Sequence, residues 1–226
     1  MIKKNITVFN EIKKYSNPLE NSSIMLIIGG LGAGKSNLIL NIFEILNESF
    51  HHAYYFTPNG KLDQTLKGNI SDEIEIINTS GELMQILRDW RDSQENKEEN
   101  GKKLLKGILI IDDSITDKSI FPPGQQKTPL TKELVSARHL KLTSIIVCHR
   151  FTQCPAVLRD ISRFVFIFPL TKKHLENISK ETQFEPEIVL KLYDEYIKDR
   201  HDFLLLDQVD RKIYYKFSKE LFSQFY

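Results

Sequence analysis

The sequence is short of cysteine, of long apolar runs and of any excess of one charge. Only two cysteines occur among the 226 residues, which excludes a disulfide-stabilised scaffold. No cluster of further cysteine or histidine residues lies near Cys148 and Cys154, so we expect both to be small core residues. The longest aliphatic runs, such as 24–28, are much shorter than a membrane-spanning helix. Because residues 1–5 are not followed by the apolar region of a secretion signal, we expect an intracellular protein.

The charge balance is nearly neutral, with 31 basic residues against 30 acidic residues and a formal net charge of +1. A polyanionic partner is therefore neither indicated nor excluded by the charge. If the protein binds nucleic acid, its basic residues must be concentrated locally, on a loop or on the surface of a ring. The length is sufficient for one α/β domain with a small appendage.

Short apolar runs alternate with segments of helical periodicity along most of the chain. We predict strands over 24–28, 53–56, 108–111, 142–148 and 164–168, and helices over 36–46, from 79 toward 90, from 128 to about 139, and from 186 to about 198. Continuous apolar strands separated by helices are typical of a parallel sheet covered on both faces. The polar stretch 92–103 predicts the end of a helix followed by a surface loop.

The last part of the chain has a different pattern. Two late strands, 203–206 and 212–217, flank a turn at Asp210–Arg211, which predicts a small antiparallel extension of the sheet. We therefore expect a single domain over 1–226, with a core over about 20–170 and a C-terminal extension over about 171–226.

A glycine-rich segment between the first strand and the first helix carries the strongest signal. Residues 29–36 fit the pattern G-x-x-x-x-G-K-[ST] of a phosphate-binding loop. The glycines let backbone N–H groups turn inward around phosphate oxygens, and the following helix adds its positive N-terminal end. We expect Lys35 to reach the β- and γ-phosphates and Ser36 to offer its hydroxyl to Mg²⁺. The residues predicted to bind ATP are Gly29, Gly30, Leu31, Gly32, Ala33, Gly34, Lys35, Ser36 and Asn37.

Two carboxylates follow the buried strand 108–111. Because the carboxyl ends of parallel strands face the ligand crevice, we expect Asp112 to lie beside the Mg²⁺ shell of Ser36. Asp113 is then the candidate for polarising the attacking water. The guanine-specific pattern N-K-x-D is absent, since Asn96–Glu99 lacks the aspartate, so ATP is favoured over GTP.

Further candidates lie around the strand 142–148. His149, directly after this strand, is positioned to hydrogen-bond the γ-phosphate or its water, with Gln153 as the alternative. Motors that work as rings place an arginine of one subunit at the γ-phosphate of its neighbour. Arg138 and Arg159 are candidates for that arginine, although each is also compatible with an ordinary ion pair.

The connection after the acid pair is long for an α/β domain, and long loops are often functional. Its polar residues suit contacts with a nucleic-acid backbone without reading the bases. A plain flexible loop explains them equally well. The candidate DNA contacts are Lys118, Gln125, Gln126 and Lys127.

Taken in order, these motifs resemble the poxvirus-like genome-packaging ATPases of large DNA viruses and virophages, within the FtsK–HerA superfamily of P-loop NTPases. The resemblance runs from about Ile24 to Phe168 and depends on the phosphate loop, on 110–113, and on Arg138–His139 followed by the strand before His149. Pro155 and Arg159 extend it. It implies a RecA-like fold in which Lys35, Ser36 and Asp112 bind ATP and Mg²⁺.

The same resemblance implies a homo-oligomeric ring, pentameric or hexameric, that pulls double-stranded DNA into a capsid or portal vertex. Asp113 lies where the superfamily often has a catalytic glutamate, and His149 lies where many relatives have a glutamine. We expect such a protein in the cytoplasm of the infected host cell, at the viral factory, and in the virion. Two alternatives stay open, a small-molecule P-loop kinase and a nucleotide-dependent assembly switch.

Overall fold

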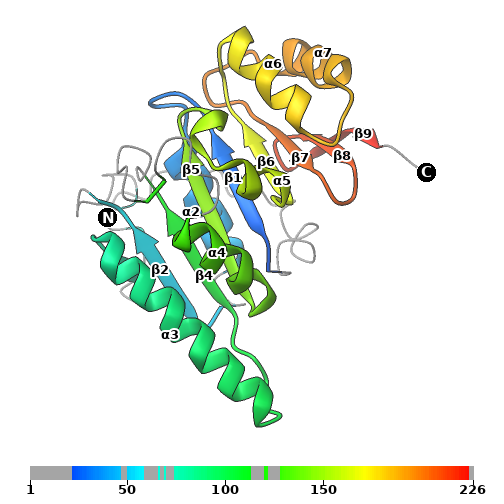
Figure 1. The fold of residues 1–226 in the computed structure, drawn as a ribbon. Helices are drawn as coiled ribbons and strands as arrows, with labels where there is room; N and C mark the ends of the chain where they lie inside the picture. Colours follow the sequence, from blue (N-terminus) through cyan, green and yellow to red (C-terminus); the bar gives the residue numbers. More distant parts are fainter. Residues whose placement is uncertain are drawn as a thin grey trace.

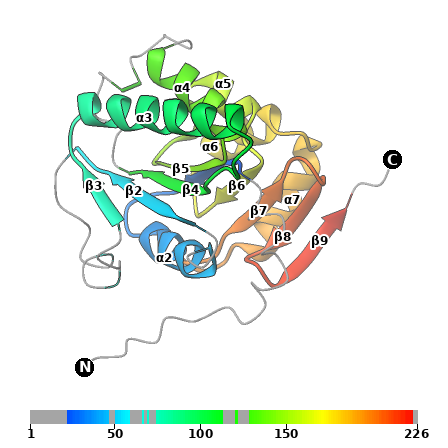
Figure 2. The same ribbon diagram turned by 90° about the horizontal axis from the view of Figure 1, so that it is seen from below.

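A computed structural model describes residues 22–46, 50–58, 66, 69, 74–112, 120–121 and 128–223. These residues form one sheet with helices packed on both faces (Figures 1 and 2). The strands are β1 (Ile24–Ile28), β2 (His52–Phe56), β3 (Ile74–Ile77), β4 (Gly107–Ile111), β5 (Leu142–Cys148), β6 (Phe164–Ile167), β7 (Leu204–Asp207), β8 (Lys212–Tyr215) and β9 (Lys219–Ser223). The helices are α2 (Lys35–Leu46), α3 (Ser80–Glu99), α4 (Pro129–His139), α5 (Ala156–Asp160), α6 (Lys172–Glu181) and α7 (Pro186–Tyr196).

The nine strands lie in the order β3-β2-β4-β5-β1-β6-β7-β8-β9. From β3 to β6 all neighbours are parallel, whereas β7, β8 and β9 are antiparallel to their neighbours. The strand β5 therefore lies between β1 and β4, so the strand before the phosphate loop and the strand before the acid pair are not adjacent. The α/β fold with a mostly parallel sheet and an antiparallel C-terminal part is confirmed.

The central strands are mostly apolar because both of their faces are covered; the exceptions are Thr143 and Ser144, which are buried in β5. In β1, Ile24, Leu26 and Ile28 belong to the core on one face of the sheet, and Met25 and Ile27 belong to the core on the other face. Successive side chains of a strand point to opposite faces, so a strand buried on both sides favours apolar residues at every position.

The two faces are covered by different helices. Helices α3, α4, α5, α6 and α7 all contribute residues to the core that contains Leu26, and α2 packs on the opposite face with Leu38, Ile39 and Ile42. In Figure 2, α3 and α4 lie above the sheet and α2 lies below it. Capping boxes begin α3 at Thr79 and α4 at Thr128, where the side-chain oxygen accepts a hydrogen bond from an otherwise unpaired N–H.

Several details differ from the sequence-based expectations. The helix that begins after Thr79 continues well beyond Trp90 to Glu99, so most of the polar stretch 92–103 is helical and only its last residues form the loop. The elements β3, α5, α6 and β9 were not predicted. The turn at Asp210–Arg211 is confirmed between β7 and β8.

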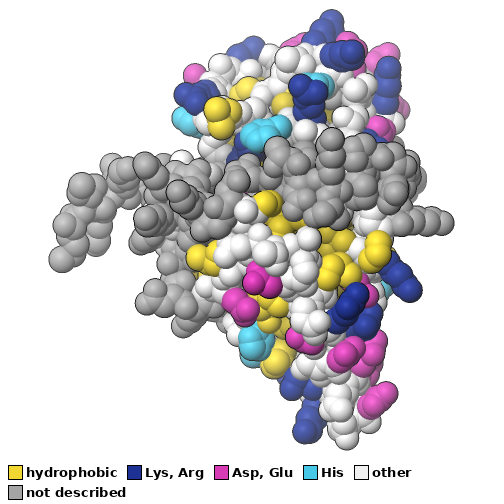
Figure 3. All heavy atoms as spheres, turned by 60° about the vertical axis from the view of Figure 1, so that its left-hand side comes forward, with side chains coloured by type: hydrophobic (Ala, Val, Ile, Leu, Met, Phe, Trp, Pro, Cys, Tyr) yellow, Lys and Arg dark blue, Asp and Glu magenta, His cyan; other side chains and the backbone are white. Residues whose placement is uncertain are grey.

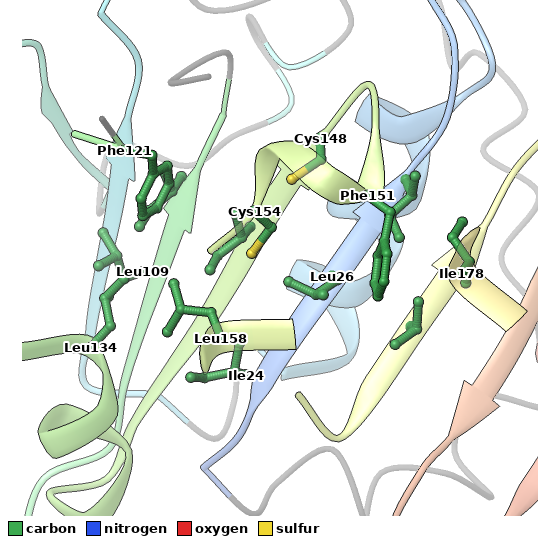
Figure 4. Packing of buried hydrophobic residues seen from close by; sticks show 14 of the residues in the cluster. Ile24, Leu26, Leu109, Phe121, Leu134, Cys148, Phe151, Cys154, Leu158 and Ile178 are labelled. Carbon is green, nitrogen blue, oxygen red and sulfur yellow. The ribbon is translucent and has the colours of Figure 1, made fainter. Parts of the chain in front are cut away.

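The cysteines lie in the core, as predicted. Cys148 and Cys154 are free and buried, and Figure 4 shows their sulfur atoms among Leu26, Leu158 and other apolar side chains. Within the described ranges, no helix combines the length and the apolarity that crossing a membrane requires.

Candidate active site

The candidate site lies at the carboxyl ends of the parallel strands β1, β5 and β4. Ile28 pairs with Cys148, and the Gly29 N–H donates to the Cys148 carbonyl at 3.1 Å. The start of the phosphate loop is therefore level with His149. On the other side of β5, Ile111 pairs with Ile146, so Asp112 lies at the same carboxyl ends of the strands. The fold thus brings together three segments that are far apart in the sequence.

The phosphate loop turns sharply between β1 and α2. Gly32 and Gly34 have φ angles of 68° and 101°, a left-handed region that residues with a Cβ rarely adopt. The Leu38 N–H donates to the Gly34 carbonyl at 3.0 Å, so the helix begins directly at the loop. This strand–loop–helix arrangement is the geometry in which backbone N–H groups and a helix N-terminus bind phosphate.

The polar side chains of the loop differ in their surroundings. Lys35 Nζ donates to the carbonyls of Gly29 and Gly30, at 3.0 and 2.8 Å, which holds the ammonium group against the loop backbone. Ser36 is half-buried and Asn37 is exposed on the first turn of α2. Leu31, in the middle of the loop, is 90% exposed.

Asp112 is held by a residue that sequence reasoning missed. Its backbone N–H donates to the Phe56 carbonyl at 3.0 Å, and Tyr55 Oη donates to Asp112 Oδ2 at 2.5 Å. Tyr55 is only 1% exposed and comes from β2, the strand next to β4. A carboxylate oriented by a buried phenol is suited to hold a cation in one place. Asp113 lies outside the described residues.

The histidine candidate and its alternative are separated by the structure. His149 follows β5 at the level of the phosphate loop, whereas the Gln153 Oε1 atom accepts a hydrogen bond from the Arg150 N–H at 2.9 Å. Gln153 thus caps the 3₁₀ turn Phe151–Gln153 locally. His149 therefore stays the predicted residue near the phosphates, and Gln153 has a local role in the turn.

A family comparison identifies the group of proteins that share this arrangement. The model of the poxvirus A32 protein family matches residues 12–205, which is most of the chain. The chain belongs to this family. The similar curated proteins are the DNA packaging proteins OPG160 of variola virus and vaccinia virus, each 27% identical over 146 residues. That match covers 62% of this chain and 51% of the relative. The chain thus spans about half the length of the curated relatives it matches.

Solved structures share the fold. The genome packaging NTPase B204 of Sulfolobus turreted icosahedral virus 2, in complex with ATP-gammaS, is 19% identical with a TM-score of 0.62, and the match covers 86% of the A32-family chain and 96% of B204. EccC of Thermomonospora curvata (ATPases 2 and 3) is 12% identical with a TM-score of 0.58, over 92% of this chain and 38% of EccC. Both likenesses support the α/β fold described above.

The two arginine candidates of the A32-family chain lie in different environments. Arg138 is near the end of α4, four residues before β5 begins. It therefore lies near the amino end of β5, about one strand length (about 20 Å) from the phosphate loop of its own chain. The Arg159 side chain is only 12% exposed and forms an ion pair with Glu181 at 2.5 Å. Its guanidinium also lies over the Phe151 ring, 4.9 Å from the centroid. Arg159 is therefore engaged within its own chain.

The residues near the loop fit a magnesium ion that also binds phosphate. Among the described residues, no group of three or more His, Cys, Asp or Glu side chains could hold a metal by itself. Mg²⁺ commonly takes one or two protein oxygens and completes its shell with substrate phosphates and water. The Asp112 carboxylate and the Ser36 hydroxyl are such oxygens.

The four candidate DNA contacts, Lys118, Gln125, Gln126 and Lys127, lie outside the described residues. On the face of the molecule in Figure 3, Lys and Arg side chains alternate with Asp and Glu side chains and do not gather into one basic patch. Positive and negative side chains are thus interspersed on that face, in keeping with the near-neutral net charge of the chain.

Proposed function

We propose that this chain is an ATP-hydrolysing motor that moves double-stranded DNA into a viral capsid. The observation that carries the proposal is that the phosphate loop, His149 and Asp112 all follow the carboxyl ends of neighbouring strands. The names of the similar proteins support it, because the poxvirus relatives are DNA packaging proteins and B204 is a genome packaging NTPase.

The proposed chemistry assigns one role to each side chain. The loop N–H groups and Lys35 bind the ATP phosphates, and Ser36 and Asp112 would hold Mg²⁺. When bound, Mg²⁺ would offset the negative charge on the β- and γ-phosphates. Asp113 accepts the proton of the attacking water, and His149 hydrogen-bonds the γ-phosphate or that water. Tyr55 keeps the Asp112 carboxylate in position.

Hydrolysis at the interfaces of a homo-oligomeric ring is part of the proposal. Arg138 is the better candidate for the arginine that acts on a neighbour, because it lies too far from its own phosphate loop to act there. The ion pair of Arg159 with Glu181 argues for a structural role of that residue. A pentamer and a hexamer both fit this scheme.

The proposed partners are double-stranded DNA, gripped by its backbone through Lys118, Gln125, Gln126 and Lys127, and a capsid or portal vertex. Backbone contacts neutralise phosphates and release counterions, so DNA stimulation should weaken as the salt concentration rises. The proposed location is the cytoplasm of the infected cell, at the viral factory, and the virion.

The first test is the ATPase rate with and without long double-stranded DNA. We expect DNA to stimulate the wild type, and Lys35→Ala to abolish ATP binding and turnover. Asp113→Asn should still bind a fluorescent ATP analogue but lose about a hundredfold or more of the stimulated rate, since a general base contributes at least that much. Full stimulated turnover in Asp113→Asn would contradict its role as the base.

The alternatives give different results in the same assay. A robust rate that ignores DNA, together with phosphate transfer to a nucleoside or sugar, would point to a kinase. Very slow turnover with nucleotide-dependent binding of a capsid protein would point to an assembly switch. Either result would contradict the motor.

A further inference from the structure

The turn after α7 lies directly on the phosphate loop, although it is distant in the sequence. His201 Nδ1 is 3.2 Å from the Ala33 carbonyl oxygen, a contact across 168 positions of the chain. Arg200, one residue earlier, lies against Gly32. A Cβ atom built on Gly32 would be only 1.8 Å from Arg200 Nη2. The C-terminal extension therefore places a guanidinium group in contact with the backbone of the loop.

A buried carboxylate fixes the shape of this turn. Asp202 Oδ2 accepts from the N–H groups of Lys198 and Asp199, at 3.0 and 2.8 Å. Asp202 Oδ1 accepts from Tyr215 Oη at 2.7 Å and forms an ion pair with Lys216 at 2.9 Å. The Asp202 side chain is 4% exposed. Four donors on one buried carboxylate make the turn a defined part of the fold, so the position of Arg200 follows from it.

Arg200 is exposed, and in the part of the chain that the structure describes it forms no ion pair with an acidic side chain. The loop it touches stands at the positive N-terminal end of α2, where phosphate-binding loops offer backbone N–H groups to an anion. A further positive group at such a point is unfavourable alone and strongly favourable when a phosphate is bound.

We propose that Arg200 binds a phosphate group of the nucleotide held by the phosphate loop of the same chain. This inference rests on the proposed function, since it assumes that the loop binds ATP. It adds to the site an arginine from the C-terminal extension that differs from both candidates for a neighbour's arginine. The extension thereby contacts the nucleotide directly and becomes part of the binding site.

The test measures the affinity of wild type and variants for two probes, ATP and inorganic tripolyphosphate. Tripolyphosphate carries the phosphates without base or ribose, so it isolates the contact we propose. We expect Arg200→Ala to weaken both ligands by about ten- to a hundredfold, the usual effect of one charge-assisted hydrogen bond. Arg200→Lys, which keeps the charge but loses the fork of donors, should recover part of that loss.

The matched control is Lys191→Ala, which removes an exposed positive charge from α7 in the same extension. It should bind both probes as the wild type does. Because Arg200 is exposed, Arg200→Ala should also keep the melting temperature of the nucleotide-free protein, while the rise in that temperature on adding ATP becomes smaller.

Two results would overturn the inference while leaving ATP binding intact. The first is unchanged affinity of Arg200→Ala for both probes, and the second is a loss for ATP with none for tripolyphosphate, which would mean a contact to base or ribose. Failure of the wild type to bind ATP at all would instead overturn the proposed function. The Lys35→Ala variant, which should bind neither probe, separates these cases.

Discussion

Tyr55 and Asp112 meet across two neighbouring strands, and the phenol is the donor that orients the carboxylate. Tyr55→Phe keeps the buried ring and removes only this donor. If Asp112 holds Mg²⁺, the Mg²⁺ concentration for half-maximal ATPase activity should rise by about tenfold, the usual cost of losing a partner of a metal ligand. The measurement is the ATPase rate against Mg²⁺ at saturating ATP.

Tyr54→Phe is the matched control for this prediction, because it removes a phenol hydroxyl from the same strand but on the opposite face. The Tyr54 ring lies near His52 and Trp90, away from Asp112. Its Mg²⁺ dependence should equal that of the wild type. An unchanged Mg²⁺ dependence in Tyr55→Phe would show that the phenol does not influence the metal.

At the residue scale, the sequence predicts those parts of the site that are contiguous. The pattern of residues 29–36 alone predicts a phosphate loop, and Asp112 directly follows a strand whose apolar run is visible in the sequence. Tyr55 and Arg200 carry no such signal. Tyr55 reaches Asp112 only because β2 pairs with β4, and Arg200 reaches Gly32 only because the turn after α7 folds back onto the phosphate loop. Contacts of this kind depend on tertiary structure, which spacing does not encode.

The packing of α3 on the sheet leaves no room at the first residue of β4. A Cβ atom on Gly107 would lie 2.7 Å from Trp90 Cη2 and 2.8 Å from Leu142 Cδ1. The Trp90 ring is also fixed by the hydrogen bond from its Nε1 to the Leu140 carbonyl at 2.9 Å. Gly107→Ala should therefore destabilise the fold by about 1–3 kcal/mol, as overpacked cores do.

Gly81→Ala, on the helix α3 that carries Trp90, is the control. Gly81 lies in the first turn of α3, and the nearest atom to an added Cβ is Thr79 Oγ1 at 4.0 Å. An alanine there should be neutral or stabilise by up to about 1 kcal/mol. Urea unfolding of both variants gives the two free energies, and equal stabilities would contradict the packing argument.

The turn held by Asp202 makes a prediction about pH. Burial alone would raise the pKa of Asp202, but the hydrogen bonds from the Asp199 N–H, Lys216, Tyr215 and the Lys198 N–H outweigh it and hold the pKa well below its ordinary value. A lowered pKa in the folded state stabilises the fold above the unfolded pKa, near 4 (about 3.9 for Asp). That stabilisation is lost as the pH falls toward the folded pKa.

Asp202→Asn should accordingly lower the free energy of unfolding by about 2 kcal/mol at pH 7, since it leaves the ammonium group of Lys216 without its anion. The difference from the wild type should shrink below about pH 4, where the carboxylate of the unfolded wild type becomes protonated. Urea unfolding at pH 7 and at pH 3 measures both values. A difference that stays constant over this range would contradict the argument.

At the element scale, prediction succeeds where burial dictates composition. The central strands β1, β4, β5 and β6 are buried on both faces, so each is a largely apolar run that the sequence displays, interrupted in β5 by Thr143 and Ser144. The edge strand β3 contains exposed residues and only Ile77 is buried, which leaves too little pattern to find. In α6 only Leu175, Ile178 and Ser179 are buried, so one narrow stripe of a polar segment carries the signal.

At the scale of the whole molecule, both cores join the first strand, β1, to the C-terminal extension. The core on one face contains Ile24 and also Ile213, and the core on the other contains Met25 and also Phe217. The extension is therefore bound into the same hydrophobic interior as the phosphate-loop strand. We propose that the chain is a single cooperative unit, which agrees with the expectation of one domain.

Deletion of the residues after 170 tests this proposal. It would expose the edge of β6 and remove Phe203, Leu205 and Phe217 from the core around Phe166. We expect the shortened chain to aggregate on size-exclusion chromatography, while the full chain unfolds in one transition by both circular dichroism and tryptophan fluorescence. A soluble, folded fragment that binds ATP would contradict the proposal.

The turn held by Asp202 connects the end of β8 with the phosphate loop. Tyr215 and Lys216, at and just after the end of β8, hold the carboxylate that shapes the turn, and the turn touches the phosphate loop. The strand β9 is the last strand of the sheet (Figure 1), and its residues Lys219 and Glu220 are exposed, so a dye can be attached there at the surface. A fluorophore on β9 would therefore report, through the Asp202 turn, on what binds at the phosphate loop.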